Sequence, residues 1–311
     1  MAAHPIRIGT RGSPLALWQA ETVKDLLHEK AGLPVDAVEI VQVTTSGDKI
    51  LDRRLADFGG KGLFTKELDN ALADGSIDCA VHSLKDVPTF LPDAFVLAAY
   101  LTREDPRDAL VAPGAKTLTD LPEGARVGTA SLRREAMLRA ARPDLDVSLI
   151  RGNVGTRLKK LADGAFDATL LAYAGLKRLG LQDEATGILD PETFIPAVGQ
   201  GIVAVQIRSS DHTLAEQLRS LNDRHAETAA RTERAFLAKL DGSCRSPIAG
   251  HARLADGTIS FSGMLMTQDG VHHLRIDDKG GIGDGEALGV RVAQSILNKA
   301  PPELLAVLEE E

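Results

Sequence analysis

The sequence predicts an α/β fold of three domains, and three observations support this prediction. Strand-like and helix-like segments alternate along the first two thirds of the chain, this alternation restarts once, and the last third has a different pattern. We therefore expect two similar α/β domains facing each other across a cleft, followed by a smaller α+β domain. With 311 residues, 43% of them hydrophobic, the chain is long enough for several cores.

The first domain is expected to begin with a strand over residues 6–8 and a helix over residues 13–31. Ser13 is a good N-cap, Pro14 suits the first helical position, and Gly32 suits the end. The other expected elements are strands at 38–43, 77–81 and 95–101 and a helix at 64–73. Residues 44–62 form a long, charged, glycine-rich segment, which is either a functional lid or disordered, and we favour a lid.

The pattern restarts after Pro106. The expected elements that follow are strands at 108–111, 126–127, 147–150 and 168–172 and helices at 131–142 and 153–162, and a further strand at 202–207 comes after the loop 196–201. Both domains contain a strand, a Gly-Thr pair, a capping serine and a helix: Gly9-Thr10 with Ser13, and Gly128-Thr129 with Ser131. Helix N-termini bind anions well, although ordinary serine capping explains either case alone.

The last third predicts an α+β domain. A long helix at 226–240 precedes strands at 248–254, 259–266 and 272–276, and a helix at 285–299 follows them. The strands come in succession without helices between them, which distinguishes this part from the first two domains.

Composition and charge exclude several classes of protein. A net charge of −8 and 4% aromatic residues argue against a nucleic-acid binder or a protein held on anionic lipid. No apolar run reaches membrane-spanning length, and no Cys/His grouping has zinc-ligand spacing, so neither a membrane span nor a metal is expected. Two cysteines and no visible signal peptide favour a reducing, cytoplasmic setting.

Arginines stand at strand-to-helix junctions, where local rules disfavour them. Arg133 and Arg134 fall in the first turn of a helix, where a cation opposes the helix dipole by about 0.3–1 kcal/mol. Arg151 and Arg157 flank another junction, and Arg11 precedes the first helix. An anionic ligand would relieve the repulsion, and arginine binds carboxylates in bidentate fashion. Solvated arginines or internal salt bridges are the alternative; we favour a polyanion site.

Two segments carry reactive groups. Ser83, Lys85 and Asp86 follow an apolar strand, and ligands bind at the carboxyl ends of strands in α/β sheets; capping and solvation are the alternative roles. Cys244 lies in a turn-like segment beside an arginine, which could activate it as a nucleophile. Cys79 lies in an apolar run and is expected to be a buried strand residue.

The combination of these segments resembles the porphobilinogen deaminase family, also called the hydroxymethylbilane synthases. Ten runs match the family in order and spacing across the chain. They are TRGSPLALWQA (10–20), GGKGLFTKEL (59–68), AVHSLKDVP (80–88), REDPRDAL (103–110), VGTASLRR (127–134), LRAARPDL (138–145), RGNVGTRLKKL (151–161), AGLKRLGL (174–181), PAVGQG (196–201) and GSCRSPIAG (242–250).

The resemblance implies an enzyme that condenses four porphobilinogen molecules head to tail into hydroxymethylbilane and releases ammonia each time. It implies a dipyrromethane primer bound through a thioether to Cys244, and it implies Asp86 as the catalytic carboxylate. Each pyrrole carries an acetate and a propionate, so the growing chain gains negative charge that arginines can bind. The implied partners are porphobilinogen and the polypyrrole chain, with no nucleic acid and no membrane, and a monomer is expected.

The resemblance also assigns binding residues. The residues implied to hold the cofactor are Ser83, Lys85, Thr129, Ser131, Arg133, Arg134, Arg151 and Gly152. The residues implied to bind substrate are Arg11, Ser13, Lys61, Phe64, Arg157, Arg178 and Gln200.

The family fold implies two domains like the halves of periplasmic binding proteins, with a hinged cleft. Domain 1 would take residues 1–101 and 200–219, domain 2 residues 106–195, and domain 3, with the cysteine loop, residues 223–311. Ser46, Asp57 and Arg245 depart from the commoner family pattern. A non-catalytic, two-domain anion-binding protein is the alternative function, and it would need neither Asp86 nor Cys244.

Overall fold

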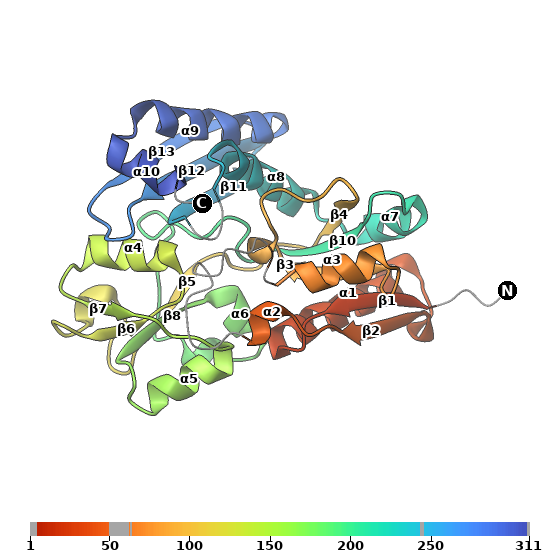
Figure 1. Cartoon of the computed structure of the whole chain (residues 1–311), viewed down its shortest axis with the longest axis horizontal. Helices are drawn as coiled ribbons and strands as arrows, with labels where there is room; N and C mark the ends of the chain where they lie inside the picture. Colours follow the sequence, from red (N-terminus) through yellow and green to blue (C-terminus); the bar gives the residue numbers. More distant parts are fainter. Residues whose placement is uncertain (1–4, 50–61, 63, 243–245, 310–311) are drawn as a thin grey trace. The chain divides into compact units, whose positions relative to one another are not determined.

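The computed structural model describes residues 5–49, 62, 64–242 and 246–309 (Figure 1). Its residues form two compact units. The first takes its residues from Met1–Ile50, Gly60–Glu104 and Ile202–Glu227, and the second from Asp105–Gly201 and Thr228–Glu311. The first unit is therefore assembled from segments on either side of residues 105–201. The predicted boundaries of three domains remain a prediction.

The first unit is built on a five-stranded sheet in the order β2-β1-β3-β10-β4. Strand β1 is parallel to β2 and β3, whereas β10 is antiparallel to β3 and β4. The strands are β1 (Ile6–Thr10), β2 (Val38–Gln42), β3 (Cys79–Ser83), β4 (Phe95–Tyr100) and β10 (Val203–Arg208).

The longest helix of this unit packs on the sheet because apolar residues recur on one of its sides. In α1 (Pro14–Ala31), Ala20, Val23 and Leu27 are fully buried against the sheet. The helix begins where Ser13 Oγ accepts a hydrogen bond from the Ala16 amide, and it ends at Gly32 in the left-handed region. The other helices of the unit are α2 (Ser46–Lys49), α3 (Lys66–Ala73) and α7 (His212–Leu218).

The second unit repeats the arrangement in the order β7-β6-β8-β5-β9. Strand β6 is parallel to β7 and β8, and β5 is antiparallel to β8 and β9. The strands are β5 (Asp108–Val111), β6 (Arg126–Gly128), β7 (Asp146–Ser148), β8 (Ala168–Ala172) and β9 (Gly187–Ile188), and the helices are α4 (Leu132–Ala141), α5 (Val154–Ala162) and α6 (Tyr173–Arg178). In each sheet the strand beside the first edge strand, β1 or β6, leads into a serine-capped helix, so the internal repeat seen in the sequence is structural.

The C-terminal part carries a three-stranded antiparallel sheet, β11 (Ile248–Ala255), β12 (Thr258–Met266) and β13 (His273–Gly281). The helices α8 (Arg224–Lys239) and α9 (Gly285–Lys299) pack on it, and α10 (Pro302–Glu309) follows (Figure 1). Phe236 of α8 meets Phe261 of β12 edge to face, with ring centroids 5.0 Å apart. A Cβ at Gly263 would lie 2.5 Å from the Phe236 ring, so this glycine permits the close approach of α8.

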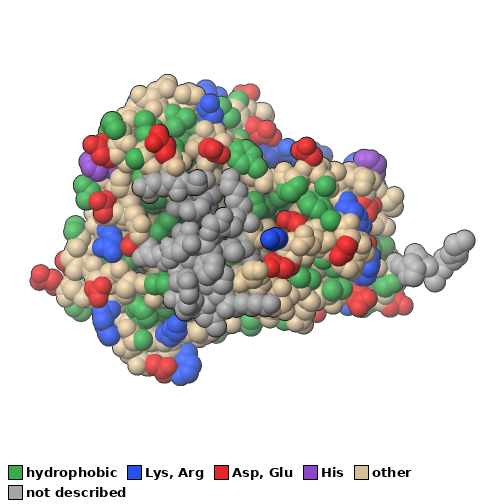
Figure 2. Space-filling model, in the orientation of Figure 1, with side chains coloured by type: hydrophobic (Ala, Val, Ile, Leu, Met, Phe, Trp, Pro, Cys, Tyr) green, Lys and Arg blue, Asp and Glu red, His purple; other side chains and the backbone are tan. Residues whose placement is uncertain are grey.

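The predicted fold class is confirmed: the chain has two five-stranded α/β sheets with the same spatial arrangement of strands, and a smaller α+β part. Sequence patterns missed four short helices, α2, α6, α7 and α10, and the two-residue strand β9. Among the described residues no helix has the length and apolar character needed to cross a bilayer, and no three His, Cys, Asp or Glu side chains form a metal cluster. Figure 2 shows acidic and basic side chains interspersed over the described part of one face.

Candidate active site

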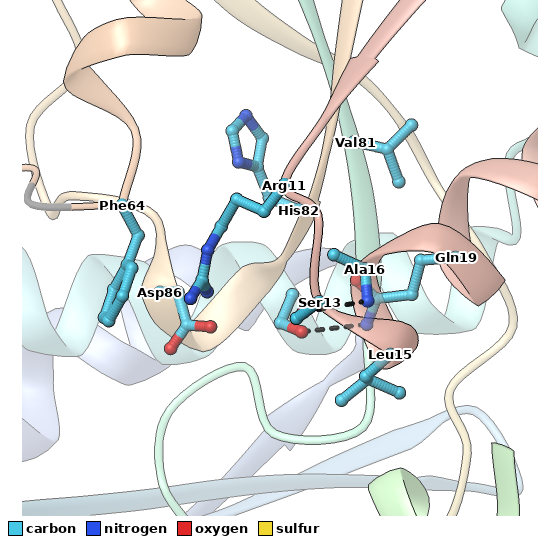
Figure 3. A pocket seen from close by; sticks show the side chains of 10 residues that line it. Arg11, Ser13, Leu15, Ala16, Gln19, Phe64, Val81, His82 and Asp86 are labelled. Atoms are coloured by element: carbon cyan, nitrogen blue, oxygen red, sulfur yellow. Dashed lines mark hydrogen bonds between the residues drawn. The ribbon is translucent and has the colours of Figure 1, made fainter. Parts of the chain in front are cut away.

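A pocket in the first unit opens at the carboxyl end of β3 (Figure 3). It brings together five of the residues predicted from the sequence to act in the site: Arg11, Ser13, Phe64, Ser83 and Asp86. Arg11 and Ser13 come from the β1–α1 junction, and Ser83 and Asp86 come from the end of β3. Parallel strands thus deliver polar groups to one edge of the sheet, as expected for a ligand site in an α/β domain.

Asp86 is held on a rigid turn. Strand β3 ends at Ser83, and Leu84–Asp86 form one turn of 3₁₀ helix in which the Val87 amide donates to the Leu84 carbonyl at 3.1 Å. The Leu84 side chain is buried, and its amide donates to the Ile202 carbonyl at 2.9 Å. These bonds fix the backbone while the Asp86 side chain stays exposed in the pocket. A carboxylate on a fixed turn can face a cationic reacting group without reorganising.

Arg11 lies across the aromatic face of Phe64. The guanidinium carbon is 3.9 Å from the ring centroid, which is close enough for a cation–π interaction. In Figure 3 the Arg11 guanidinium, the Phe64 ring and the Asp86 carboxylate converge on one opening. A positive charge beside an aromatic surface suits a flat ring that bears carboxylates.

Gln19 is a pocket residue that the sequence did not reveal. Its side chain is 2% exposed, and its Nε2 donates to Ser83 Oγ at 2.8 Å. The bond fixes the Ser83 hydroxyl and ties α1 to β3. His82 also lines the pocket; burial lowers its pKa to about 4, and the charge of Arg11 adds to this, so its ring is neutral near pH 7.

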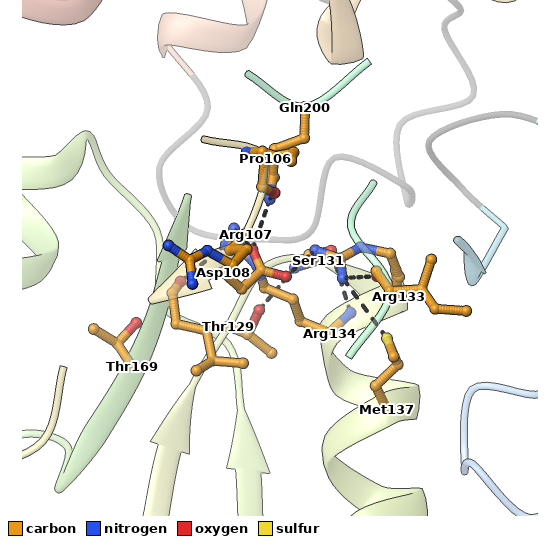
Figure 4. A network of polar contacts seen from close by, with 12 residues as sticks. Pro106, Arg107, Asp108, Thr129, Ser131, Arg133, Arg134, Met137, Thr169 and Gln200 are labelled. Atoms are coloured by element: carbon orange, nitrogen blue, oxygen red, sulfur yellow. Dashed lines mark hydrogen bonds and ion pairs between the residues drawn. The ribbon is translucent and has the colours of Figure 1, made fainter. Parts of the chain in front are cut away.

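A buried ion network in the second unit surrounds Asp108, which is fully enclosed (Figure 4). Its Oδ2 accepts from Arg133 Nη2 at 2.7 Å, and its Oδ1 accepts from Arg134 Nη2 at 2.7 Å. Arg133 also donates to the Ile195 carbonyl at 2.8 Å, and Arg134 to the Leu170 carbonyl at 2.8 Å. The two guanidinium groups are therefore oriented by acceptors within the chain.

This network corrects one inference from the sequence. An anionic ligand is not required to relieve the repulsion at the start of α4, because Asp108 lies between the two arginines and internal salt bridges hold both. One carboxylate opposite two guanidiniums still leaves one net positive charge. The Arg133 Nε atom is enclosed without a hydrogen-bond partner among the described residues. The chemistry of this set therefore fits a carboxylate-bearing cofactor, with Thr129 and Ser131 at the same helix start.

The charges of the network determine the pKa of Asp108. Burial by itself raises this pKa, but Arg133 and Arg134 lower it further than burial raises it, and the Asp108 pKa ends well below its ordinary value. A carboxyl whose pKa is lowered on folding stabilises the native state above its unfolded pKa of about 3.9. That stabilisation is lost as the pH falls from there toward the folded pKa.

We expect Asp108→Asn to lower the free energy of unfolding at pH 7 by about 3–5 kcal/mol, because two buried guanidiniums lose their counter-charge. The difference from the wild type should shrink below about pH 4, where the wild-type carboxyl begins to be protonated in the unfolded chain. Urea denaturation at pH 7 and pH 3.5 measures both effects. Asp167→Asn, which breaks the exposed pair with Arg126, is the control. Equal losses in the two variants would contradict the central role of Asp108.

The start of α5 holds three more of the predicted residues. Arg151 is 8% exposed, and Arg157 Nε donates to the Gly152 carbonyl at 2.8 Å. Gly152 has a φ of +118°, and a Cβ there would lie 2.6 Å from Thr156, so glycine is required. Asn153 caps the helix through the Thr156 amide at 2.9 Å. The junction thus places two arginines beside the Asn153-capped start of α5.

Gln200 and Arg178 meet at the turn 199–201. Gln200 is 1% exposed, and its Nε2 donates to the Pro106 carbonyl at 2.7 Å and to Asp108 Oδ1 at 2.9 Å. Arg178 Nη2 donates to the Gly201 carbonyl at 2.7 Å. The turn is thereby joined to the same network as Arg133 and Arg134.

Some predicted residues lie outside the described residues. These are Lys61 and Cys244, most of the expected lid at 44–62, and the departures Asp57 and Arg245. Ser46 is described: its amide and hydroxyl both donate to Glu67 Oε1, the amide at 2.9 Å. Lys85 is partly buried next to Asp86.

Comparison with known proteins identifies the family. The family model described as "Porphobilinogen deaminase, dipyromethane cofactor binding domain" matches residues 6–216, and "Porphobilinogen deaminase, C-terminal domain" matches residues 228–298. The chain belongs to the porphobilinogen deaminase family. The predicted family, the enzyme class and the dipyrromethane cofactor are therefore confirmed.

Curated porphobilinogen deaminases are similar over nearly their whole length. The protein from Nitrobacter hamburgensis is 53% identical over 293 residues, 94% of this chain and 93% of the relative. The protein from Nitrobacter winogradskyi is 52% identical over the same shares. A solved structure, the VFT2 domain of Bordetella pertussis BvgS, is 17% identical with a TM-score of 0.43, and the match covers 70% of this chain and 85% of that one.

Proposed function

We propose that this chain condenses four porphobilinogen molecules on a dipyrromethane primer attached to Cys244, releasing ammonia and giving hydroxymethylbilane. The observation that carries the proposal is the position of Asp86, fixed on its turn in a pocket with Arg11 and Phe64, in a chain of the porphobilinogen deaminase family. The two features that a simple anion-binding protein lacks, the carboxylate and the cysteine, are both present in this chain.

Asp86 would act on the reacting pyrrole. When the aminomethyl C–N bond breaks and ammonia leaves, the pyrrole becomes an electron-poor cation, and a carboxylate that accepts from its N–H stabilises this cation. The amine must gain a proton before it leaves, and the carbon that forms the new C–C bond must lose one. Asp86 would move both protons. When bound, the primer would supply the pyrrole carbon for the first C–C bond, and each added ring would supply the carbon for the next.

The arginines would hold the carboxylates. Arg133 and Arg134 present fixed donors with a net positive charge after Asp108 is counted, and Arg151, Arg157 and Arg11 add to this. Guanidinium groups already oriented by internal acceptors lose little entropy when they bind a carboxylate. Thr129, Ser131, Ser83 and Lys85 would complete the cofactor contacts, and Ser13, Phe64, Lys61, Arg178 and Gln200 the substrate contacts.

The function is tested by adding porphobilinogen to the purified chain. We expect four ammonia molecules for each hydroxymethylbilane released, measured by a coupled ammonia assay and by chromatography of the product. An anion-binding protein would retain porphobilinogen without releasing ammonia, and that result would overturn the proposal. We further propose a cytoplasmic setting, on the basis of the chain's two cysteines, and a monomer, on the basis of the family resemblance.

A further inference from the structure

Glu233 is a buried carboxylate that bonds two separate segments of the second unit. It lies on α8, and its side chain is fully enclosed. Its Oε2 accepts from the Gly199 amide at 2.6 Å, and its Oε1 accepts from the Ala252 amide at 2.8 Å. Hydrogen bonds to a charged acceptor are about twice as strong as neutral ones, so this side chain fixes both backbones.

The segment that contains Ala252 follows the loop that carries Cys244, called the cysteine loop below. Helix α8 precedes this loop, and β11, which contains Ala252, follows it. Cys244 lies 11 residues after Glu233 and 8 residues before Ala252. The Glu233–Ala252 bond therefore ties together the two elements from which the cysteine loop emerges.

The segment that contains Gly199 leads to the arginine pair, Arg133 and Arg134. Gly199 precedes Gln200, and the side-chain Nε2 of Gln200 donates to Asp108 Oδ1. Asp108 in turn binds Arg133 and Arg134. A second link runs in parallel: the Ile195 carbonyl accepts from Arg133, and the Gly250 amide of β11 donates to the Pro196 carbonyl at 3.1 Å. The turn 195–200 is thus bonded to the arginine network on one side and to α8 and β11 on the other.

We propose that Glu233 is a positioning residue that holds α8 and β11, the elements before and after the cysteine loop, in a fixed relation to the turn that orients the arginine pair. This inference rests on the proposed function, in which Cys244 carries the primer and Arg133 and Arg134 bind its carboxylates. Covalent attachment fixes one end of the primer, and the arginines fix its side chains. Productive geometry therefore depends on the bonds from Glu233 to both segments.

The experiment compares Glu233→Gln with Thr232→Val. The glutamine keeps the shape but places an NH₂ group against one of the two backbone N–H donors. Thr232 is the neighbouring buried residue on α8, and its hydroxyl donates to the Thr228 carbonyl at 2.8 Å, so the valine removes a buried hydrogen bond outside the chain of contacts. Primer content is measured by intact mass, melting temperature by calorimetry, and kcat and KM for porphobilinogen well below both melting temperatures.

We expect Glu233→Gln to lose at least about tenfold in kcat with KM changed less, since a misplacement of 1 Å can cost about 10²-fold. Thr232→Val should lower the melting temperature while kcat stays near wild type. The losses of Glu233→Gln and Gln200→Ala should be non-additive, because both act through one turn. Should Glu233→Gln not fold, Glu233→Asp keeps the charge, is one methylene shorter and should show a smaller kcat loss.

Two failures are distinguishable. A wild-type protein that carries no primer and releases no ammonia contradicts the proposed function. A folded, primer-loaded Glu233→Gln or Glu233→Asp with wild-type kcat, or additive losses with Gln200→Ala, contradicts the positioning role alone.

Discussion

Asp86→Asn is expected to fold normally and to lose at least about 10²–10³-fold in kcat, the range found when one preorganised electrostatic group is removed. The asparagine has the shape of the aspartate but no charge. It cannot stabilise the pyrrole cation that forms as ammonia leaves, and it cannot accept the proton lost at the new C–C junction. Because the Asp86 side chain is exposed and its turn is held by backbone bonds of Leu84 and Val87, stability should change little.

The measurement is the initial rate of ammonia release at saturating porphobilinogen, with the melting temperature recorded on the same preparation. Asp93→Asn is the matched control, because Asp93 is another exposed aspartate in the loop before β4 and does not line the pocket. It should keep wild-type kcat. If Asp86→Asn turned over within about threefold of the control, another group would have to stabilise the cation, and the central assignment would be lost.

Elements with local start and stop signals could be predicted from the sequence. Helix α1 has a capping serine, a proline at its first position and a left-handed glycine at its end, and its predicted range of 13–31 agrees with Pro14–Ala31. Helix α9 was placed at its observed bounds, Gly285–Lys299. Helix α6 was missed because Ala172 precedes it and gives no side-chain cap. Short helices stabilised by packing leave little signal in local sequence.

Strand bounds depended on partners that the sequence does not show. The third strand of the second domain was expected at 147–150 but lies at Asp146–Ser148, because pairing with β6 matches Ser148 to Gly128 and ends there. Ile150 lies beyond the strand. It is buried with its Cβ beside Gly128, so its apolar character reflects core packing and not strand pairing.

Some residues of the candidate site could be found from local sequence, and others only from contacts between distant parts of the chain. Asp86 could be found because it follows an apolar strand and belongs to a recognisable motif. The roles of Asp108, Gln19 and Glu233 could not be found, since Asp108 meets Arg133 across 25 residues, Gln19 meets Ser83 across 64, and Glu233 meets Gly199 across 34. The unusual placement of arginines at a helix start was visible, but the carboxylate that stabilises them became visible only in the fold.

Cys244→Ser is expected to abolish both the covalent primer and turnover. A serine hydroxyl is a much weaker nucleophile than a thiolate at neutral pH, so the protein should have the mass of its amino acids alone. Without an attached primer, the pyrrole cations have no anchored carbon to attack them. Hydroxymethylbilane formation should therefore fall below about 1% of the wild-type rate, since removal of a nucleophile commonly costs far more than about 10²-fold.

Cys79→Ala is the control that separates this loss from any general need for a thiol. Cys79 is fully buried in β3, and burial raises the pKa of its thiol to about 12, so it stays protonated and unreactive at neutral pH. The alanine variant should keep the added mass of the primer and most of the activity, with a small loss of stability from the cavity. Intact mass in acid and the ammonia assay on both variants decide the matter. A primer that is retained in Cys244→Ser, or lost in Cys79→Ala, would contradict attachment at Cys244. It would place the attachment at Cys79, which is fully buried in β3.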